Sequence, residues 1–296
     1  MKYTNNFFLP ETIVRGAQRQ NAKYNKGNSD RSVTQLIAPP QIDVLRKKHF
    51  VDMEKDISED WWSLFGSAIH YILEMGVDHT QTPEERLFLN VNGWTISGAI
   101  DLQTPVEGGI RISDYKVTTA YPLTATDGKI EWEQQLNMQA YLVESNKGVK
   151  VVDVEIIAIV RDWDRKKAVI DLNYPVAPVV KVPVRLWSRE EQEAYILERV
   201  ALHQMADMAS ETGEDLPECS AEDRWVKNDK WAVMKVGGKR AVRTITDREE
   251  AEAFVPEEGY YLQYRPGQSY RCDYCGVSKW CGQYSRMMKE KEEASE

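Results

Sequence analysis

The sequence lacks the features that would direct it into or across a membrane. No stretch reaches eighteen consecutive apolar residues, which excludes a conventional membrane-spanning helix. The first residues, MKYTNNFFLPETIVRG, have neither the apolar core nor the small-residue cleavage site of a signal peptide. We therefore expect a cytoplasmic protein with no membrane partner.

Basic residues are fewer than acidic ones: the chain has 38 Lys and Arg against 47 Asp and Glu, a net charge of −9. Because phosphate binding depends on Lys and Arg, this balance by itself disfavours a nucleic-acid partner. The first 50 residues are an exception, with nine basic and three acidic side chains. This segment is either a solvated arm or a phosphate-binding surface, so the distribution of charge matters more than its total.

The hydrophobic content of 42% and aromatic content of 10% exclude a disordered chain, and 296 residues are enough for one elaborated domain or two small ones. In the middle of the chain, hydrophobic periodicity predicts an α/β unit with the element order αβββαβ. The Asn92-Gly93 and Gly108-Gly109 pairs predict turns between its first three strands. The expected elements are a buried helix at 61–75, strands at 86–90, 94–103 and 110–117, a helix at 131–145, and a strand at 150–161 paired with 168–172.

The flanking segments have weaker patterns. Residues 1–30 are polar and are expected to be loosely ordered, and Pro39-Pro40 interrupts a helical pattern over 32–49. A capping box beginning at Ser188 predicts a helix to about residue 210, followed by a hairpin at 231–245 and a short helix at 246–254. We expect a basic arm and helix at 1–50, a core at 51–210, a hairpin and cysteine unit at 211–285 and a charged tail at 286–296.

Two aspartates follow apolar runs in neighbouring predicted strands. Asp101 ends one strand and Asp114 ends the next, so their carboxylates could converge on a divalent cation. Lys116 lies two residues beyond Asp114 and therefore projects from the same face of the strand. This combination suits phosphodiester hydrolysis, in which a metal neutralises phosphate charge and activates water.

The helices on either side of these strands carry polar residues on apolar surfaces. His70 lies one turn after Gly66, where the missing side chain would permit close backbone approach. His70 is either a buried histidine with a satisfied hydrogen bond or a member of the acidic cluster. Gln135 begins the segment QLNMQAYLV and is either a surface residue or an amide that orients water or a DNA strand.

These motifs together resemble the RecB-type branch of the PD-(D/E)XK nuclease superfamily. The similarity rests on G-x-x-x-H (Gly66, His70), Asp101, D-Y-K (Asp114 to Lys116) and the Q-L-N-M motif that begins at Gln135. The similarity spans residues 32–172. Phage-encoded members of the family also resemble the C-terminal third of this chain. The resemblance implies the PD-(D/E)XK fold, a mixed central sheet flanked by helices.

The resemblance also implies roles for individual residues. His70, Asp101, Asp114 and the backbone carbonyl of Tyr115 would bind Mg²⁺ or Mn²⁺. Lys116 would be the catalytic lysine, and Gln135 the motif glutamine. Members of the family often have a tyrosine four residues after that glutamine, whereas this chain has Gln139.

The four cysteines are Cys219, Cys272, Cys275 and Cys281, and the last three form a C-x2-C-x5-C motif. Clustered cysteines in a reducing compartment indicate a metal rather than disulfides, and four thiolates suit either a zinc ion or a [4Fe-4S] cluster. The motif is similar to the iron–sulfur motif of RecB-like nucleases, which favours the cluster. In those relatives the fourth cysteine precedes the G-x-x-x-H helix, so here Cys219 would have to replace it.

We therefore expect a Mg²⁺- or Mn²⁺-dependent deoxyribonuclease, an exonuclease acting on DNA ends or single strands in recombination, repair or replication. The resemblance places it in a bacterial cell or a phage-infected host, with a recombinase, a single-strand-binding protein or a helicase as possible protein partners. Aromatic and basic residues over 224–243 form either a strand-binding surface or an ordinary amphipathic hairpin. The alternatives are an endonuclease of the same fold or a non-catalytic DNA-binding accessory protein in recombination.

Overall fold

A computed structural model describes residues 1–23, 26–124, 129–255 and 259–293, so residues 294–296 of the expected tail lie outside it. The chain forms two units. Unit 1 contains residues 1–38 and 50–214, and unit 2 contains residues 39–49 and 215–296. No helix in the described part of the chain is both long and apolar enough to cross a membrane.

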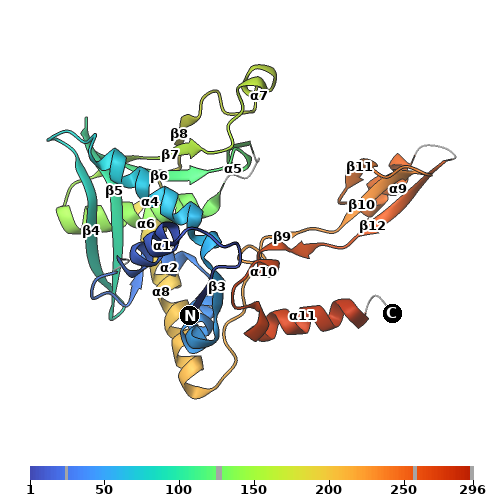
Figure 1. The fold of residues 1–296 in the computed structure, drawn as a ribbon, viewed down its shortest axis with the longest axis horizontal. Helices are drawn as coiled ribbons and strands as arrows, with labels where there is room; N and C mark the ends of the chain where they lie inside the picture. The colour runs from blue at the N-terminus through green and yellow to red at the C-terminus, as the bar shows by residue number, and fades with distance from the viewer. Residues whose placement is uncertain (24–25, 125–128, 256–258, 294–296) are drawn as a thin grey trace. The chain divides into compact units, whose positions relative to one another are not determined.

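Unit 1 is built on a mixed six-stranded sheet in the order β2-β5-β6-β7-β8, with β4 also paired to β5 (Figure 1). β5 is antiparallel to β4 and β6, β6 is parallel to β7, and β7 is antiparallel to β8. The strands are β2 (Arg31–Ser32), β4 (Thr82–Val91), β5 (Trp94–Val106), β6 (Gly109–Thr118), β7 (Val151–Val160) and β8 (Val179–Pro183). The predicted α/β arrangement, with a mixed sheet flanked by helices, is confirmed.

The two predicted turns set the register of the central strands. Asn92 and Gly93 both have positive φ angles, 49° and 80°, as a two-residue hairpin turn requires. They join β4 to β5 with Val91 directly opposite Trp94. At Gly109 a Cβ atom would lie 2.1 Å from the carbonyl oxygen of Lys150, so only glycine permits the close approach of β6 to the start of β7.

The main hydrophobic core lies between the sheet and three helices, α2 (Val33–Ile37), α6 (Ile130–Lys147) and α8 (Arg189–Thr212). The predicted capping box at Ser188 begins α8. Within α8, Arg199 and His203 are buried and contact the last carbonyl groups of α2, which satisfies that helix end. The core includes Val33, Leu36, Ile96, Ile100, Ile112, Leu136, Leu142, Ile156, Ile196 and Val200.

The helix predicted at 61–75 forms, as α4 (Trp61–Glu74), but it is not buried. It contacts β6 and α1 (Glu11–Lys23), and none of its residues is buried. Three of its apolar side chains, Trp61, Trp62 and Tyr71, are 46%, 51% and 65% exposed. The expectation of a loose segment over 1–30 is also corrected, because α1 occupies thirteen of those residues and packs on α4.

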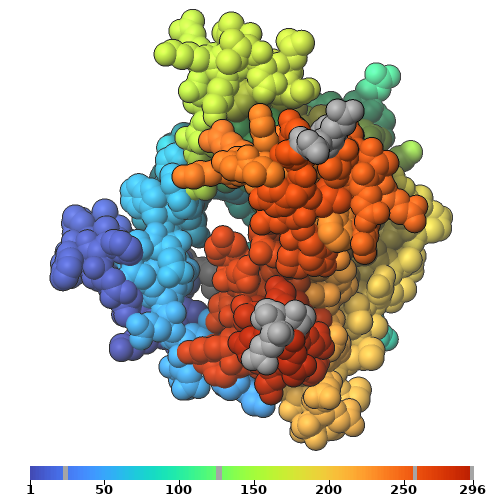
Figure 2. Space-filling model, turned by 90° about the vertical axis from the view of Figure 1, so that its right-hand side faces the viewer, coloured from blue at the N-terminus to red at the C-terminus, as the bar shows by residue number. Residues whose placement is uncertain are grey.

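One predicted strand is wrong. Residues Arg165–Ile170 form the helix α7, whose N-cap Asp164 accepts hydrogen bonds from the amides of Lys166 and Lys167. The partner of β7 is instead β8, which lies further along the chain. The α7 segment protrudes from unit 1, yellow-green in Figures 1 and 2, and Leu172 is 99% exposed.

Unit 2 combines α3 (Pro40–Lys48) with the C-terminal segment. A three-stranded sheet has the order β11-β10-β12, and its strands are β10 (Lys230–Lys235), β11 (Ala241–Ile245) and β12 (Tyr260–Arg265). This sheet contains the predicted hairpin and packs against α9 (Arg248–Phe254). The remaining elements of the unit are β9 (Val226–Lys227), β13 (Gln268–Ser269), α10 (Tyr270–Asp273), η3 (Ser278–Trp280) and α11 (Gly282–Glu293).

Short elements of unit 1 complete the fold. β1 (Lys2–Thr4) pairs in parallel with β3 (Glu54–Asp56). The others are η1 (Phe50–Asp52), η2 (Ile57–Asp60) and α5 (Tyr121–Thr124). The break predicted at Pro39-Pro40 separates α2 from α3, because a proline ring cannot continue the preceding helix.

Candidate active site at the fork between two strands

The candidate site lies where β5 and β6 separate. The two strands pair from Val106 and Gly109 to Leu102 and Ser113, and beyond that point β6 continues beside β7 alone. Asp101 and Asp114 are the first residues past the last pair, and both are buried. The Asp101 carboxylate accepts a hydrogen bond of 2.9 Å from the amide of Tyr115. The fork thus brings two acidic side chains together and keeps them largely out of water.

One half of the site is formed by β6 and α6. Asp114 Oδ2 lies 2.6 Å from Lys116 Nζ, and Asp114 Oδ1 accepts a 2.6 Å hydrogen bond from Gln135 Nε2. Lys116 Nζ donates in turn to Gln135 Oε1 at 3.0 Å. These contacts hold the lysine and the amide beside a carboxylate that is 1% exposed. The structure therefore places Gln135 at the acidic cluster rather than on the surface.

The other half is formed by α4 and β4. His70 Nδ1 lies 3.1 Å from Glu84 Oε1 and 3.7 Å from Asp101 Oδ2. The other ring nitrogen, Nε2, lies 3.2 Å from the carbonyl oxygen of Tyr115. His70, Glu84 and Asp101 offer ligand atoms that all lie within 4.8 Å of one another. Imidazole nitrogen with carboxylate and carbonyl oxygens is a donor set that suits a divalent cation such as Mn²⁺ or Mg²⁺.

Glu84 was missed by the sequence interpretation, which began the strand at residue 86. The ladder between β4 and β5 pairs residues on both sides of Glu84 but skips it, and Glu84 has a positive φ of 46°. A signal was present in the sequence, because counting eight residues outward on each side of the Asn92-Gly93 turn brings Glu84 opposite Asp101. The turn alone could have located this third acidic residue.

The electrostatics of the cluster favour the binding of positive charge. The hydrogen bond with Glu84 and the charge of Asp101 raise the pKa of His70 to about 9, against the effect of partial burial. Burial and the neighbouring Asp114 raise the pKa of Asp101 to about 7. Without a cation, these groups retain protons at neutral pH that a metal ion would displace.

The structure also describes the surroundings of Gln139, which stands at the family's tyrosine position, and of Gly66. Gln139, one turn after Gln135, is buried and donates to the carbonyl oxygen of Ala99 at 2.8 Å, so it ties α6 to β5. A Cβ atom at Gly66 would meet nothing within 4 Å. The explanation that Gly66 allows close approach within the fold is therefore wrong.

Comparison with known proteins decides the family. Residues 29–282 match the PD-(D/E)XK nuclease superfamily. The chain belongs to this superfamily. It is therefore a nuclease, and the fork between β5 and β6 is the place where its chain carries the D…D-x-K residues.

Two solved structures are similar to this chain at low identity. The crystal structure of SSO0001 has a TM-score of 0.46 at 14% identity, covering 73% of this chain and 89% of that one. A candidate exonuclease from Eubacterium rectale has a TM-score of 0.30 at 13% identity, covering 71% of this chain and 77% of that one. No curated protein matches the sequence.

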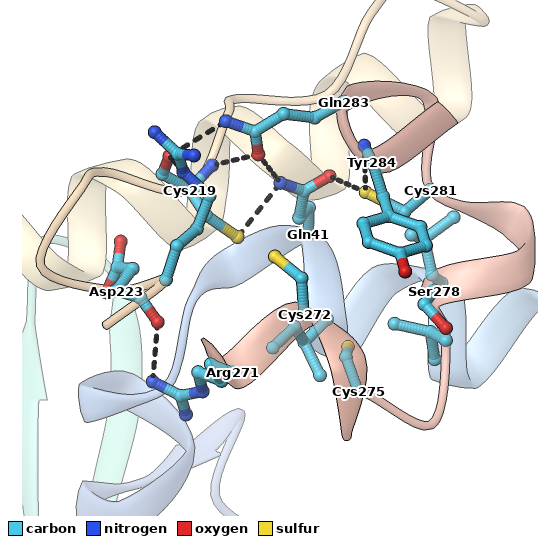
Figure 3. A pocket seen from close by; sticks show the side chains of 14 residues that line it. Gln41, Cys219, Asp223, Arg271, Cys272, Cys275, Ser278, Cys281, Gln283 and Tyr284 are labelled. Carbon is cyan, nitrogen blue, oxygen red and sulfur yellow. Dashed lines mark hydrogen bonds between the residues drawn. The ribbon is translucent and has the colours of Figure 1, made fainter. Parts of the chain in front are cut away.

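The nuclease carries a second cluster of polar side chains in unit 2, where all four cysteines line one pocket (Figure 3). Cys219 is brought to the C-x2-C-x5-C segment by two buried glutamines. Gln283 accepts from the backbone amide of Cys219 and donates to its carbonyl oxygen, both at 2.9 Å. Gln41, from α3, donates to the Cys219 sulfur at 3.0 Å and accepts from Cys281 Sγ at 3.5 Å. Three separate segments therefore converge on this pocket.

The thiols in this pocket are spaced rather than clustered tightly. Among the described residues, which include all four cysteines, no three sulfur atoms lie within 4.8 Å of one another. Burial raises the pKa of Cys219 to about 12 and also raises the pKa of Cys272. As free thiols these groups would stay protonated and unreactive at neutral pH. Their convergence is compatible with a metal group, which would deprotonate them on binding.

Proposed function

We propose that this protein is a divalent-metal-dependent deoxyribonuclease of the RecB-like type, and that it acts as an exonuclease on DNA ends or single strands. The observation that supports this most strongly is the convergence of His70, Asp101, Asp114 and Lys116 on one fork of the sheet. A bound Mg²⁺ or Mn²⁺ would supply charge neutralisation at the phosphate and an activated water. In this proposal the enzyme works in the cytoplasm of a bacterial cell or phage-infected host, where its DNA substrate is found.

Each residue of the fork has a distinct task in this proposal. His70, Asp101, Asp114 and the carbonyl of Tyr115 hold the cation, and Glu84 adds a carboxylate beside His70. Lys116 places a positive charge next to the reacting phosphate, where it stabilises negative charge in the transition state. Gln135 holds both Asp114 and Lys116, which fixes the lysine relative to the carboxylate.

The test is Mg²⁺- or Mn²⁺-dependent degradation of labelled DNA by Asp114→Asn and Lys116→Met variants. We expect each to lower the rate by about 10²-fold or more, because Asp114→Asn removes a proposed ligand of the cation and Lys116→Met removes the positive charge next to the reacting phosphate. Asp153→Asn is the matched control, since Asp153 pairs with Arg111 on the same sheet away from the fork. Unchanged cleavage by both fork variants, with folding verified by circular dichroism, would refute the assignment.

The mode of attack can be separated from the chemistry with a closed substrate. An exonuclease requires an end, so it should degrade a linear strand and leave a covalently closed circle of the same sequence intact. Rapid cleavage of the circle would identify an endonuclease instead. Stimulation by a recombinase, a single-strand-binding protein or a helicase can be measured in the same assay.

We further propose that Cys219, Cys272, Cys275 and Cys281 hold a [4Fe-4S] cluster. The pocket that all four cysteines line supports a metal group there, and the similarity of the C-x2-C-x5-C motif to the iron–sulfur motif of RecB-like nucleases favours a cluster over zinc. Anaerobic purification with an absorbance spectrum and metal analysis distinguishes the two. A brown protein containing iron and sulfide is expected, and a colourless protein with one zinc would replace the cluster with the alternative.

A further inference from the structure

Gly66 lies in the middle of α4 although nothing in the fold requires a glycine there. A Cβ atom at this position would meet no atom within 4 Å, and the backbone is not in the left-handed region. Glycine inside a helix is destabilising relative to alanine, because it loses more backbone freedom on folding. The space beside Gly66 is therefore maintained at a cost to stability that packing does not explain.

The residues one turn before and one turn after Gly66 connect it to the candidate site and to a basic side chain. Residues four apart share a face of a helix, so Trp62, Gly66 and His70 form one row along α4. The row ends at the fork, where His70 contacts the carbonyl of Tyr115. At its other end, the guanidinium of Arg161 lies 3.7 Å from the centre of the Trp62 ring.

The row Trp62–Gly66–His70 runs alongside one strand of the sheet, β6. Tyr115 lies within β6, whereas Arg161 directly follows β7 and its amide donates to the carbonyl oxygen of Thr118, the last residue of β6. The row from His70 to Trp62 therefore follows β6 from the fork to the strand's C-terminal end. The eight residue steps from Trp62 to His70 span about 12 Å of helix, the length of about three to four nucleotides of one strand.

The chemistry of the row fits a nucleic-acid strand. Trp62 is 51% exposed, and an exposed indole offers a stacking surface that accepts any base. Arg161 lies over that ring and supplies a permanent positive charge there, as a phosphate backbone requires. Midway along the row, Gly66 presents no side chain, and a Cβ atom there would meet nothing within 4 Å. In the space-filling view the light-blue segment that includes α4 lies at the surface (Figure 2).

We propose that one DNA strand lies along the row Trp62–Gly66–His70, with Arg161 at its outer end, and that Gly66 leaves the room the strand needs. The inference rests on the proposed nuclease function, since it assigns the path by which the substrate of that site arrives. In it, Trp62 and Arg161 hold a nucleotide beyond the scissile phosphate. Gly66 is a specificity-determining residue without catalytic contact.

The test compares two glycines. Gly16 also lies within a helix, α1, and a Cβ atom there meets nothing within 4 Å either. Leucine is introduced at each position, and KM and kcat are measured with a labelled single strand in Mn²⁺. We expect Gly66→Leu to raise KM about tenfold or more, because a displaced strand no longer reaches the fork, with Mn²⁺ affinity unchanged. Gly16→Leu should leave KM unchanged, and neither variant should melt at a lower temperature than the wild type.

A second variant tests the outer end of the row without altering Gly66. Trp62→Ala should raise KM about tenfold through the loss of one stacked base. An unchanged KM in Gly66→Leu, or an equal rise in Gly16→Leu, would overturn the proposal. A wild-type protein that cleaves no DNA in Mg²⁺ or Mn²⁺ would instead refute the proposed function, so the two failures are distinguishable.

Discussion

His70 Nδ1 lies 3.1 Å from Oε1 of Glu84, although the two residues are fourteen positions apart and belong to different elements, the helix α4 and the strand β4. The contact orients the imidazole so that its other nitrogen reaches the carbonyl of Tyr115. A carboxylate that holds a metal-binding histidine fixes the ring orientation and raises its basicity. Glu84 therefore belongs to the candidate site even though it lies outside the D…D-x-K motif.

Glu84→Gln is expected to weaken Mn²⁺ binding by about tenfold or more, the effect typical of losing a carboxylate partner of a metal-binding histidine. Isothermal titration with Mn²⁺ at pH 8 measures the affinity. Glu85→Gln is the matched control, because the Glu85 carboxylate contacts Lys147 and Gln103 instead of His70. Equal affinity in the two variants would remove Glu84 from the site.

The metal-free protein should lose stability as pH rises from about 6.5 to 9. Below pH 6.5 the buried His203, whose pKa burial lowers to about 4, opposes this trend, because its contribution to stability grows as pH rises. The pKa of Asp101 is raised from 3.8 to about 7, so its stabilising contribution is complete below pH 4 and is lost as pH rises through 7. The pKa of His70 is raised from 6.5 to about 9, so its contribution is complete below pH 6.5 and is lost through pH 9. Thermal melting in EDTA, for the wild type and Glu84→Gln, measures this decline.

In that comparison the decline between pH 6.5 and 9 should be smaller in Glu84→Gln, since His70 there lacks its hydrogen-bond partner. Added Mn²⁺ should reverse the trend, because the cation competes with the same protons and binds more tightly at higher pH. Identical pH profiles for wild type and variant would contradict the assigned coupling between His70 and Glu84.

The two glutamines of α6 should separate catalysis from stability. Gln135→Leu removes the contacts to Asp114 and Lys116 and should lower kcat by about 10²-fold, as the loss of a positioning contact in an active site does. Gln139→Leu leaves the carbonyl of Ala99 without its partner and should cost about 1–3 kcal/mol of unfolding free energy. Its kcat should stay near the wild-type value, and the reverse pattern would be inconsistent with these contacts.

Gln41→Leu should lower the affinity of the four cysteines for the metal group that they are proposed to hold. The variant loses the hydrogen bonds to the sulfurs of Cys219 and Cys281, and partners of this kind typically change metal affinity by about 10- to 100-fold. The rate of metal loss to a chelator, followed by absorbance or metal analysis, measures the effect. Gln263→Leu, an exposed position on β12, serves as the control, and equal rates in both would show that Gln41 has no such role.

The order of the central elements followed from local chemistry. Asn92-Gly93 accepts positive φ angles at low cost, and the apolar runs on either side alternate as strands do, so the β4–β5 hairpin was predictable. The same reasoning placed Asp101 and Asp114 at the ends of adjacent strands. It failed for residues 168–172, where an aspartate N-cap outweighs the strand-like composition.

The amino-acid sequence alone determined the order of the central elements and the register of the β4–β5 hairpin, and therefore that Glu84 lies opposite Asp101. These features depend on turns and on side-chain alternation within about twenty residues. Only the tertiary structure decided that β5 and β6 separate at Asp101, that Glu84 joins His70, and that Gln41 and Gln283 hold Cys219. Those contacts join segments that are distant in sequence, and their formation depends on which surfaces pack together. Two residues that meet in such a contact have no fixed spacing along the chain. No periodicity or motif in the sequence therefore predicts that they meet.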